Sequence, residues 1–128
     1  MEKTRIERAI EYITKLFQGN GDGHDLAHSL RVYKNAMMIA KAEGQGEEEI
    51  IALSALLHDC DDHKLFHTEN NANARSFLEQ EKLPAEVIEE ICKNINSVSF
   101  SKNRGKAPET IEGKIVQDAD RLEAIGAV

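Results

Sequence analysis

The sequence predicts an all-α fold with about six helices in a single domain that spans residues 1–128. Along most of the chain, apolar residues recur at intervals of three and four, which is the spacing of one helix face. No stretch alternates steadily between apolar and polar residues, as a half-buried strand does. A chain of this length is sufficient for one core but for little beyond it.

The first two helices are expected in the N-terminal third of the chain. Residues 4–17 place apolar side chains on one face, and the glycine-rich segment 18–23 ends this helix. The second helix begins at His24 and Asp25, because Asp25 can accept hydrogen bonds from the free N–H groups of a first turn. Its expected buried face comprises Leu26, Leu30, Tyr33, Met37 and Ala40.

A third predicted helix begins with the acidic residues 47–49, which the helix dipole favours in a first turn. Its expected core residues are Ile50, Leu53, Leu56 and Leu57. The apolar run then ends abruptly at His58 and Asp59, followed by Cys60 and two more acids. This pattern indicates either an exposed acidic helix end or a polar site, such as a metal ion, at the end of a buried helix.

Three further helices are expected after a loop at residues 63–67. One is centred on Phe77, and the next follows Pro84, which suits a first helical turn. The last begins near Thr110 and has an apolar stripe on which Asp118 also falls. The members of that stripe are Ile111, Ile115, Leu122 and Ile125.

Composition limits the classes of partner. The net charge of −7 argues against a nucleic-acid polymer, since binding one requires several phosphates to be neutralised together. A small phosphorylated ligand remains compatible if a metal ion supplies positive charge. The sequence has neither an export signal nor a run of about 18 apolar residues, so we expect a cytoplasmic protein without a membrane partner. Cys60 and Cys92 are expected to be reduced thiols with packing roles.

The residues that do not fit a purely structural role come from three of the predicted helices. They are His28, His58, Asp59 and either Asp118 or Asp120. Two imidazoles and two carboxylates balance the charge of a divalent ion and leave positions open for water and a substrate oxygen. The pattern is therefore typical of a catalytic metal site.

These residues closely resemble the HD-domain phosphohydrolase superfamily, whose pattern is H…HD…D on an all-α fold. The resemblance extends from about residue 23 to the C-terminus, and His58-Asp59 matches the doublet that names the family. It implies that the metal ligands are His28, His58, Asp59 and the Asp120 of the Ala-Asp-Arg-Leu segment 119–122. Asp118 is then expected to support catalysis beside the site or to act as an alternative ligand.

Charged residues near the ligands also have expected roles, and that of Asp62 follows from the resemblance. Asp62 lies four residues after His58 and is expected to position or deprotonate the attacking water. Arg31, Lys64 and Arg121 are expected to offset the charge of substrate phosphates. One metal ion is expected, because no histidine follows residue 67. Mn²⁺ is the first candidate, with Mg²⁺, Fe²⁺, Co²⁺ and Ni²⁺ as alternatives.

The expected substrate is a nucleotide or another small phosphate ester. The segment 117–126 looks most like the small stand-alone bacterial HD hydrolases, some of which cleave nucleoside triphosphates to monophosphate and pyrophosphate. The family implies further helices beyond residues 119–122, so the chain resembles the N-terminal part of the usual length. The alternative function is therefore a non-catalytic, metal-stabilised interaction domain or an inactive fragment. Apolar residues of the 111–128 helix would then be exposed, and we expect this helix to self-associate or to be covered by another chain.

Overall fold

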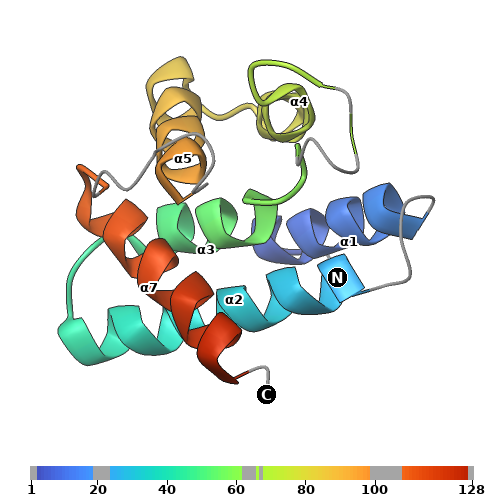
Figure 1. Cartoon of the computed structure of the whole chain (residues 1–128). Coiled ribbons are helices and arrows are strands. Elements are labelled where there is room, and N and C mark those ends of the chain that lie inside the picture. Colours follow the sequence, from blue (N-terminus) through green and yellow to red (C-terminus); the bar gives the residue numbers. More distant parts are fainter. Residues whose placement is uncertain (1–2, 19–23, 62–65, 67, 99–107, 127–128) are drawn as a thin grey trace.

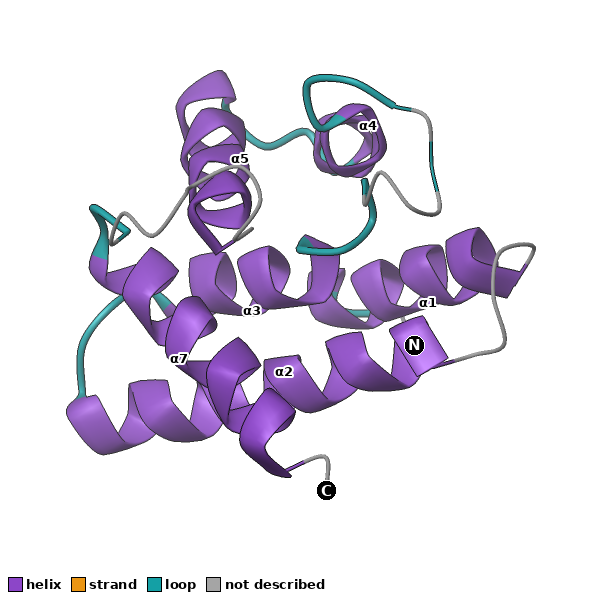
Figure 2. Ribbon diagram, in the orientation of Figure 1, coloured by secondary structure: helices purple, strands orange, loops and turns teal. Residues whose placement is uncertain are grey.

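The computed structural model describes residues 3–18, 24–61, 66, 68–98 and 108–126, and of residues 24, 25 and 124–126 only the backbone. Within these residues the regular structure is entirely helical (Figures 1 and 2), which confirms the predicted all-α class. The helices are α1 (Arg5–Gln18), α2 (His24–Glu43), α3 (Glu48–Leu57), α4 (Ala72–Gln80), α5 (Ala85–Val98) and α7 (Ile111–Gly126). None of these described helices combines the length and the apolar character that crossing a membrane requires.

Helix α3 lies at the centre of the fold. It contacts α1, α2, α5 and α7, and Figure 1 shows it between α2 on one side and α4 and α5 on the other. Every residue from Ile50 to Leu57 is buried, so the core includes more of this helix than the four predicted positions. A helix that is apolar on all sides is stable only when neighbours surround it. The residue at its C-terminal end, His58, is consequently held by a rigid element.

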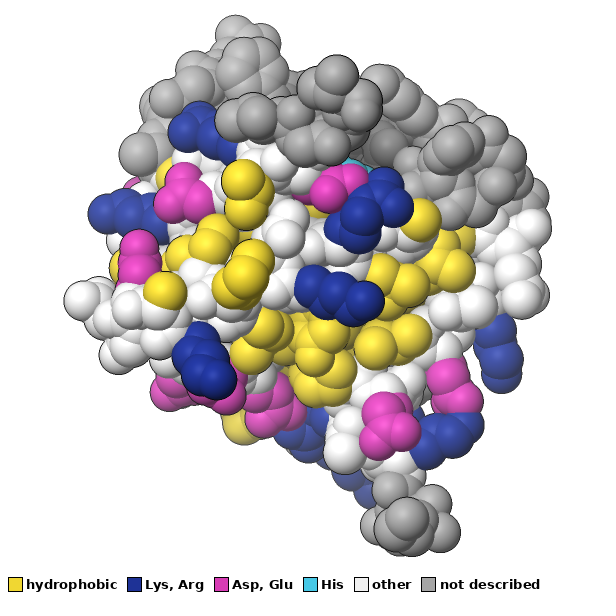
Figure 3. Space-filling model, turned by 90° about the horizontal axis from the view of Figure 1, so that it is seen from below, with side chains coloured by type: hydrophobic (Ala, Val, Ile, Leu, Met, Phe, Trp, Pro, Cys, Tyr) yellow, Lys and Arg dark blue, Asp and Glu magenta, His cyan; other side chains and the backbone are white. Residues whose placement is uncertain are grey.

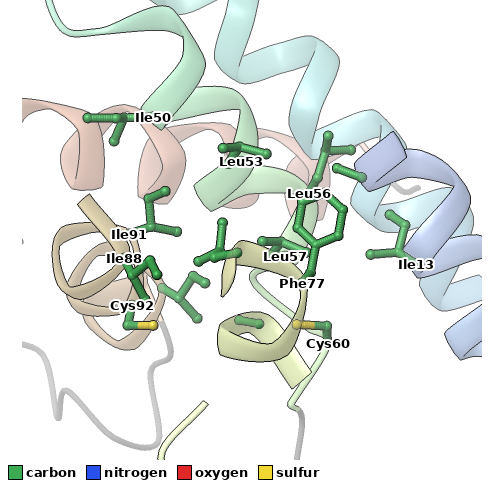
Figure 4. Packing of buried hydrophobic residues seen from close by; sticks show 14 of the residues in the cluster. Ile13, Ile50, Leu53, Leu56, Leu57, Cys60, Phe77, Ile88, Ile91 and Cys92 are labelled. Atoms are coloured by element: carbon green, nitrogen blue, oxygen red, sulfur yellow. The ribbon is translucent and has the colours of Figure 1, made fainter. Parts of the chain in front are cut away.

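Two apolar clusters pack against α3. The larger one lies between α3 and helices α1, α4 and α5, and it includes Ile13, Phe77 and Ile91 (Figure 4). Cys60 and Cys92 belong to the same cluster and are free thiols. Burial is the main cause that raises the pKa of the Cys60 thiol, so this thiol stays neutral and packs as a small apolar side chain.

The smaller cluster forms where α2 and α7 pack together against α3, and here the predicted face of α2 is only partly confirmed, since Ala40 alone of its five residues is buried. The residues of α2 that the structure buries fully are Ser29, Val32, Ala36 and Ala40. The predicted residues Leu26, Leu30, Tyr33 and Met37 are only partly buried. Small side chains on α2 let α3 and α7 pack closely against it. The spacing of apolar residues along α2 alone does not show that close packing favours this face.

Helix α7 is also rotated from its predicted orientation. Ile115, Val116 and Ala119 are buried, whereas Asp118 is exposed and therefore does not share the buried face. Leu122 is 45% exposed. Figure 3 views the molecule from the side of α2 and α7 and shows hydrophobic side chains in the middle of this face, between basic and acidic ones.

Polar contacts fix α7 relative to α3. The buried carboxylate of Glu112 accepts a hydrogen bond from the Glu47 N–H at 3.1 Å, at the start of α3. Just before α7, the Thr110 hydroxyl donates to the side-chain oxygen of Asn94 on α5 at 2.5 Å. The Asn94 amide in turn donates to Ser54 of α3 at 3.4 Å. Asn94 is buried, so these bonds are shielded from water. The helices that carry His58 and Asp120 are thereby held in one register.

Candidate metal centre

His58 is oriented by the last turn of α3. The helix ends at Leu57, and His58 continues in right-handed helical conformation as its C-cap. The Nδ1 atom lies 2.7 Å from the carbonyl oxygen of Ala55, and because a carbonyl only accepts, Nδ1 carries the hydrogen. The other nitrogen, Nε2, therefore points its lone pair away from the helix when the ring is neutral. Such a bond to the remote nitrogen is what fixes the tautomer of metal-binding histidines.

The chain after His58 is anchored by two neighbouring residues. Cys60 is buried in the core, and its N–H donates to the Leu57 carbonyl at 3.1 Å. The carboxylate of Asp61 is buried as well and accepts bonds from the Asn73 and Ala74 N–H groups at 2.9 and 3.1 Å. These are the free N–H groups of the first turn of α4, so Asp61 caps a helix that begins eleven residues later in the chain.

Four side chains meet beside this turn: one from α2, one from α7 and two that follow the end of α3. His28 of α2 and Asp120 of α7 lie 2.9 Å apart, measured from Nε2 to Oδ1. The same oxygen of Asp120 lies 3.6 Å from Nε2 of His58. Asp59 places Oδ2 at 3.4 Å from Nε2 of His58 and 3.9 Å from Nε2 of His28. The sequence-predicted ligands His28, His58, Asp59 and Asp120 are thus together in space.

The spacing of these atoms fits a divalent ion. Ligands about 2.1 Å from an ion lie about 3.0 Å apart in adjacent octahedral positions and about 4.2 Å apart in opposite ones. One donor atom from each of His28, His58 and Asp120 falls within 4.8 Å of the other two. Asp59 is not a member of that group of three, although its Oδ2 atom lies 3.4 Å from Nε2 of His58 and 3.9 Å from Nε2 of His28. Nitrogen and carboxylate donors in this mixture suit Mn²⁺, Fe²⁺, Co²⁺, Ni²⁺ or Zn²⁺.

A family model decides which class of protein carries this site. The model of the HD domain matches residues 25–125, a range that includes all four of these side chains. The chain belongs to the HD domain family. This membership and the cluster of His28, His58 and Asp120 support a divalent-metal site.

Relatives of this HD domain support the same assignment. The uncharacterized protein YpgQ of Bacillus subtilis (strain 168) is 34% identical over 132 residues, which cover 99% of this chain and 63% of YpgQ. A crystal structure of an HD-superfamily hydrolase from Bacillus thuringiensis superimposes with a TM-score of 0.77 at 32% identity, covering 96% of this chain and 62% of that one. A predicted HD-superfamily hydrolase from an uncultured Thermotogales bacterium gives a TM-score of 0.70 at 29% identity, covering 92% of this chain and 67% of that one. The chain therefore spans about three-fifths of the length of YpgQ and of the Bacillus thuringiensis hydrolase.

Charge in the HD site favours a bound cation. Burial opposes charging of the His58 imidazole, but the negative charge of Asp59 and the hydrogen bond and charge of Asp120 outweigh it and raise the pKa of His58 to about 9. Burial likewise opposes ionisation of Asp120, yet its hydrogen bond to His28 and its close approach to His58 hold the pKa of Asp120 far below its usual value. Without a metal, the proton on His58 supplies the positive charge that the two carboxylates require.

The remaining sequence-predicted site residues do not all lie among the metal-ligand candidates. Asp118 is exposed, whereas the carboxylate of Asp120 lies 2.9 Å from Nε2 of His28, so geometry favours Asp120 as the direct ligand of the two. Arg121 is exposed next to Asp120, and Arg31 forms an ion pair with Glu123. Asp62 and Lys64 lie outside the described residues.

Three groups that shape the site are not among the residues predicted from the sequence. The Ala55 carbonyl gives no sequence signal, because every residue has a carbonyl. Asp61 was noted only as one acid of a series, and its partners on α4 are far away in sequence. Glu123 could have been found, because it follows Asp120 by three residues just as Arg31 follows His28, and residues at that spacing share a helix face.

Proposed function

We propose that this chain is a metal-dependent phosphohydrolase that acts on a nucleotide or another small phosphate ester. The observation that carries the proposal is the cluster of His28, His58 and Asp120 at the end of α3 in an HD domain, with Asp59 close to both imidazoles. The side chains of His28, Asp59 and Asp120 are 29%, 28% and 34% exposed, so a substrate can approach the site from solvent. Pyrophosphohydrolase and phosphomonoesterase activity are the two competing subclasses for a nucleotide.

One divalent ion, with Mn²⁺ as the first candidate, is proposed to bind His28, His58, Asp59 and Asp120. A divalent ion in such a site lowers the pKa of water and polarises a phosphoryl oxygen. The Ala55 carbonyl holds the Nδ1–H of His58, which keeps Nε2 directed at the site. Asp59 and Asp120 supply the negative charge that favours a cation there.

The reaction joins the oxygen of water to phosphorus and breaks the bond between phosphorus and the leaving-group oxygen. Asp62 is proposed to accept the proton of that water. Arg31, Lys64 and Arg121 are proposed to offset the negative charge of the phosphates in the bound substrate. In a protein with a net charge of −7, such local positive charge is needed to attract an anionic substrate.

A turnover assay with a panel of nucleotides and phosphate monoesters in the presence of Mn²⁺ tests this proposal. Release of pyrophosphate from a nucleoside triphosphate would identify a pyrophosphohydrolase, and release of inorganic phosphate from a monoester would identify a phosphomonoesterase. Asp120→Ala protein is the matched control and should be inactive. Metal binding that raises the Tm without turnover of any substrate would instead support a metal-stabilised interaction domain.

A further inference from the structure

Helices α2 and α7 are joined by two side-chain pairs, one turn apart. The first is His28 with Asp120, at 2.9 Å. The second is the ion pair between Nε of Arg31 and Oε1 of Glu123. Each member of the second pair follows its counterpart in the first by three residues, so on both helices the two members face the same side. The guanidinium of Arg31 is therefore held beside the candidate metal centre.

The two members of the second pair differ strongly in exposure. The side chain of Glu123 is 12% exposed, whereas that of Arg31 is 54% exposed. A largely buried carboxylate is fixed by its surroundings and is costly to leave unpaired, while an exposed arginine alone would move among many rotamers. Glu123 is thus the stationary partner, and Arg31 is the one whose position the pair determines.

The atom that Glu123 contacts leaves the arginine able to bind an anion. The contact uses Nε, whereas four of the five N–H donors of a guanidinium are on its two terminal nitrogens. Those nitrogens form a planar fork that matches two oxygens of a phosphate group. A lysine at this position would carry the charge but would lack both the Nε anchor and the fork.

We propose that Glu123 is a positioning residue that holds Arg31 as a phosphate-binding fork beside the metal centre. This inference rests on the proposed function, because it assigns the arginine to a phosphate group of the same substrate. A fork that is already ordered loses less conformational entropy when it binds an anion than a mobile one does. Glu123 therefore strengthens anion binding even though its own charge repels anions.

Ordering of Arg31 and charge repulsion by Glu123 have opposite effects on anion binding, so the direction in which a Glu123 variant changes the affinity is a test. Inorganic pyrophosphate is titrated into the Mn²⁺-loaded protein, and the Kd of Mn²⁺ alone is measured separately for each variant. Glu123→Gln removes a negative charge near the anion, which by Coulomb's law alone would tighten pyrophosphate binding. Positioning predicts that binding weakens by about threefold to tenfold, with the Kd of Mn²⁺ changed by less than about twofold. Glu43→Gln removes the same charge from an exposed position at the end of α2 and should not weaken pyrophosphate binding.

Two further variants separate positioning from a purely structural role. Arg31→Lys keeps the charge at an exposed position and should weaken pyrophosphate binding by about tenfold without a change in helicity. In an Arg31→Ala background, Glu123→Gln should cause no further loss, because the residue through which Glu123 acts is absent. Pyrophosphate binding by Glu123→Gln as tight as in the wild type, or fully additive losses, would overturn the proposal. If the effect of Glu123→Gln on pyrophosphate binding persists but no nucleotide or phosphate ester is turned over, the proposed function alone is overturned. A wild-type Mn²⁺ protein that does not bind pyrophosphate would overturn this inference.

Discussion

The Nδ1–H of His58 donates to the carbonyl oxygen of Ala55, one turn back in α3, at 2.7 Å. This bond leaves Nε2 as the atom that faces Asp59 and Asp120. In the absence of a metal, Nε2 carries a proton at neutral pH, because the pKa of His58 is raised to about 9. A metal ion must therefore displace a proton from the residue that names the motif.

The first prediction concerns pH. Since binding releases the His58 proton, the affinity for Mn²⁺ should rise by about tenfold per pH unit between pH 7 and about 9 and then level off. Stability of the metal-free protein should show the opposite trend: His58 has a pKa of 6.5 when unfolded and about 9 when folded, so its contribution is complete below pH 6.5 and lost by about pH 9. Calorimetric titration in buffers of different ionisation enthalpy would detect the released proton. A pH-independent affinity would show that His58 is neutral in the free protein.

A second prediction concerns Asp62. Asp62→Asn should leave the Kd of Mn²⁺ unchanged and lower turnover by about 10²-fold, the usual scale for the loss of a positioned acid–base group. Steady-state rates with the best substrate from the nucleotide panel would measure the effect. Unchanged turnover would assign Asp62 to an outer, structural role.

The third prediction concerns Asp61, which anchors the chain after His58. Asp61→Asn should lower the free energy of unfolding by about 1–3 kcal/mol, because the charged acceptor of the Asn73 and Ala74 N–H groups is lost. Denaturant unfolding measures the change, with the exposed Asp118→Asn as the control of equal charge. Equal stability of the two variants would mean that another group satisfies the first turn of α4.

The fourth prediction concerns association. Leu122 on α7 is 45% exposed and Met38 on α2 is 60% exposed. We expect this 128-residue chain to self-associate through the α7 face, or to be covered there by another chain. Sedimentation at micromolar concentration should show a dimer or larger species that Leu122→Gln weakens. A monomer with a fully cooperative unfolding transition would argue that this face needs no partner.

Local pattern explains why most of the fold could be predicted. The helices follow from the apolar spacing, and the His58-Asp59 doublet stood out because it interrupts the apolar run of α3. The sequence does not predict which face of α2 is buried most deeply. Val32 and Ala36 form a face of small side chains, and this face is favoured only because two neighbouring helices pack closely against it. Similarly, Asp118 and Asp120 are separated by roughly 200° around a helix, and only the position of α7 against α2 decides which one reaches His28.

The most direct test of the account is a Mn²⁺ titration of the wild type, His58→Ala and Asp59→Ala, with helicity followed in parallel. The wild type should bind one equivalent. Each variant should lose that binding while keeping most of its helicity, because both residues follow the last residue of α3 and do not lie within it. If either variant still bound one equivalent of Mn²⁺ with wild-type affinity, the metal centre would not be the one that these residues form.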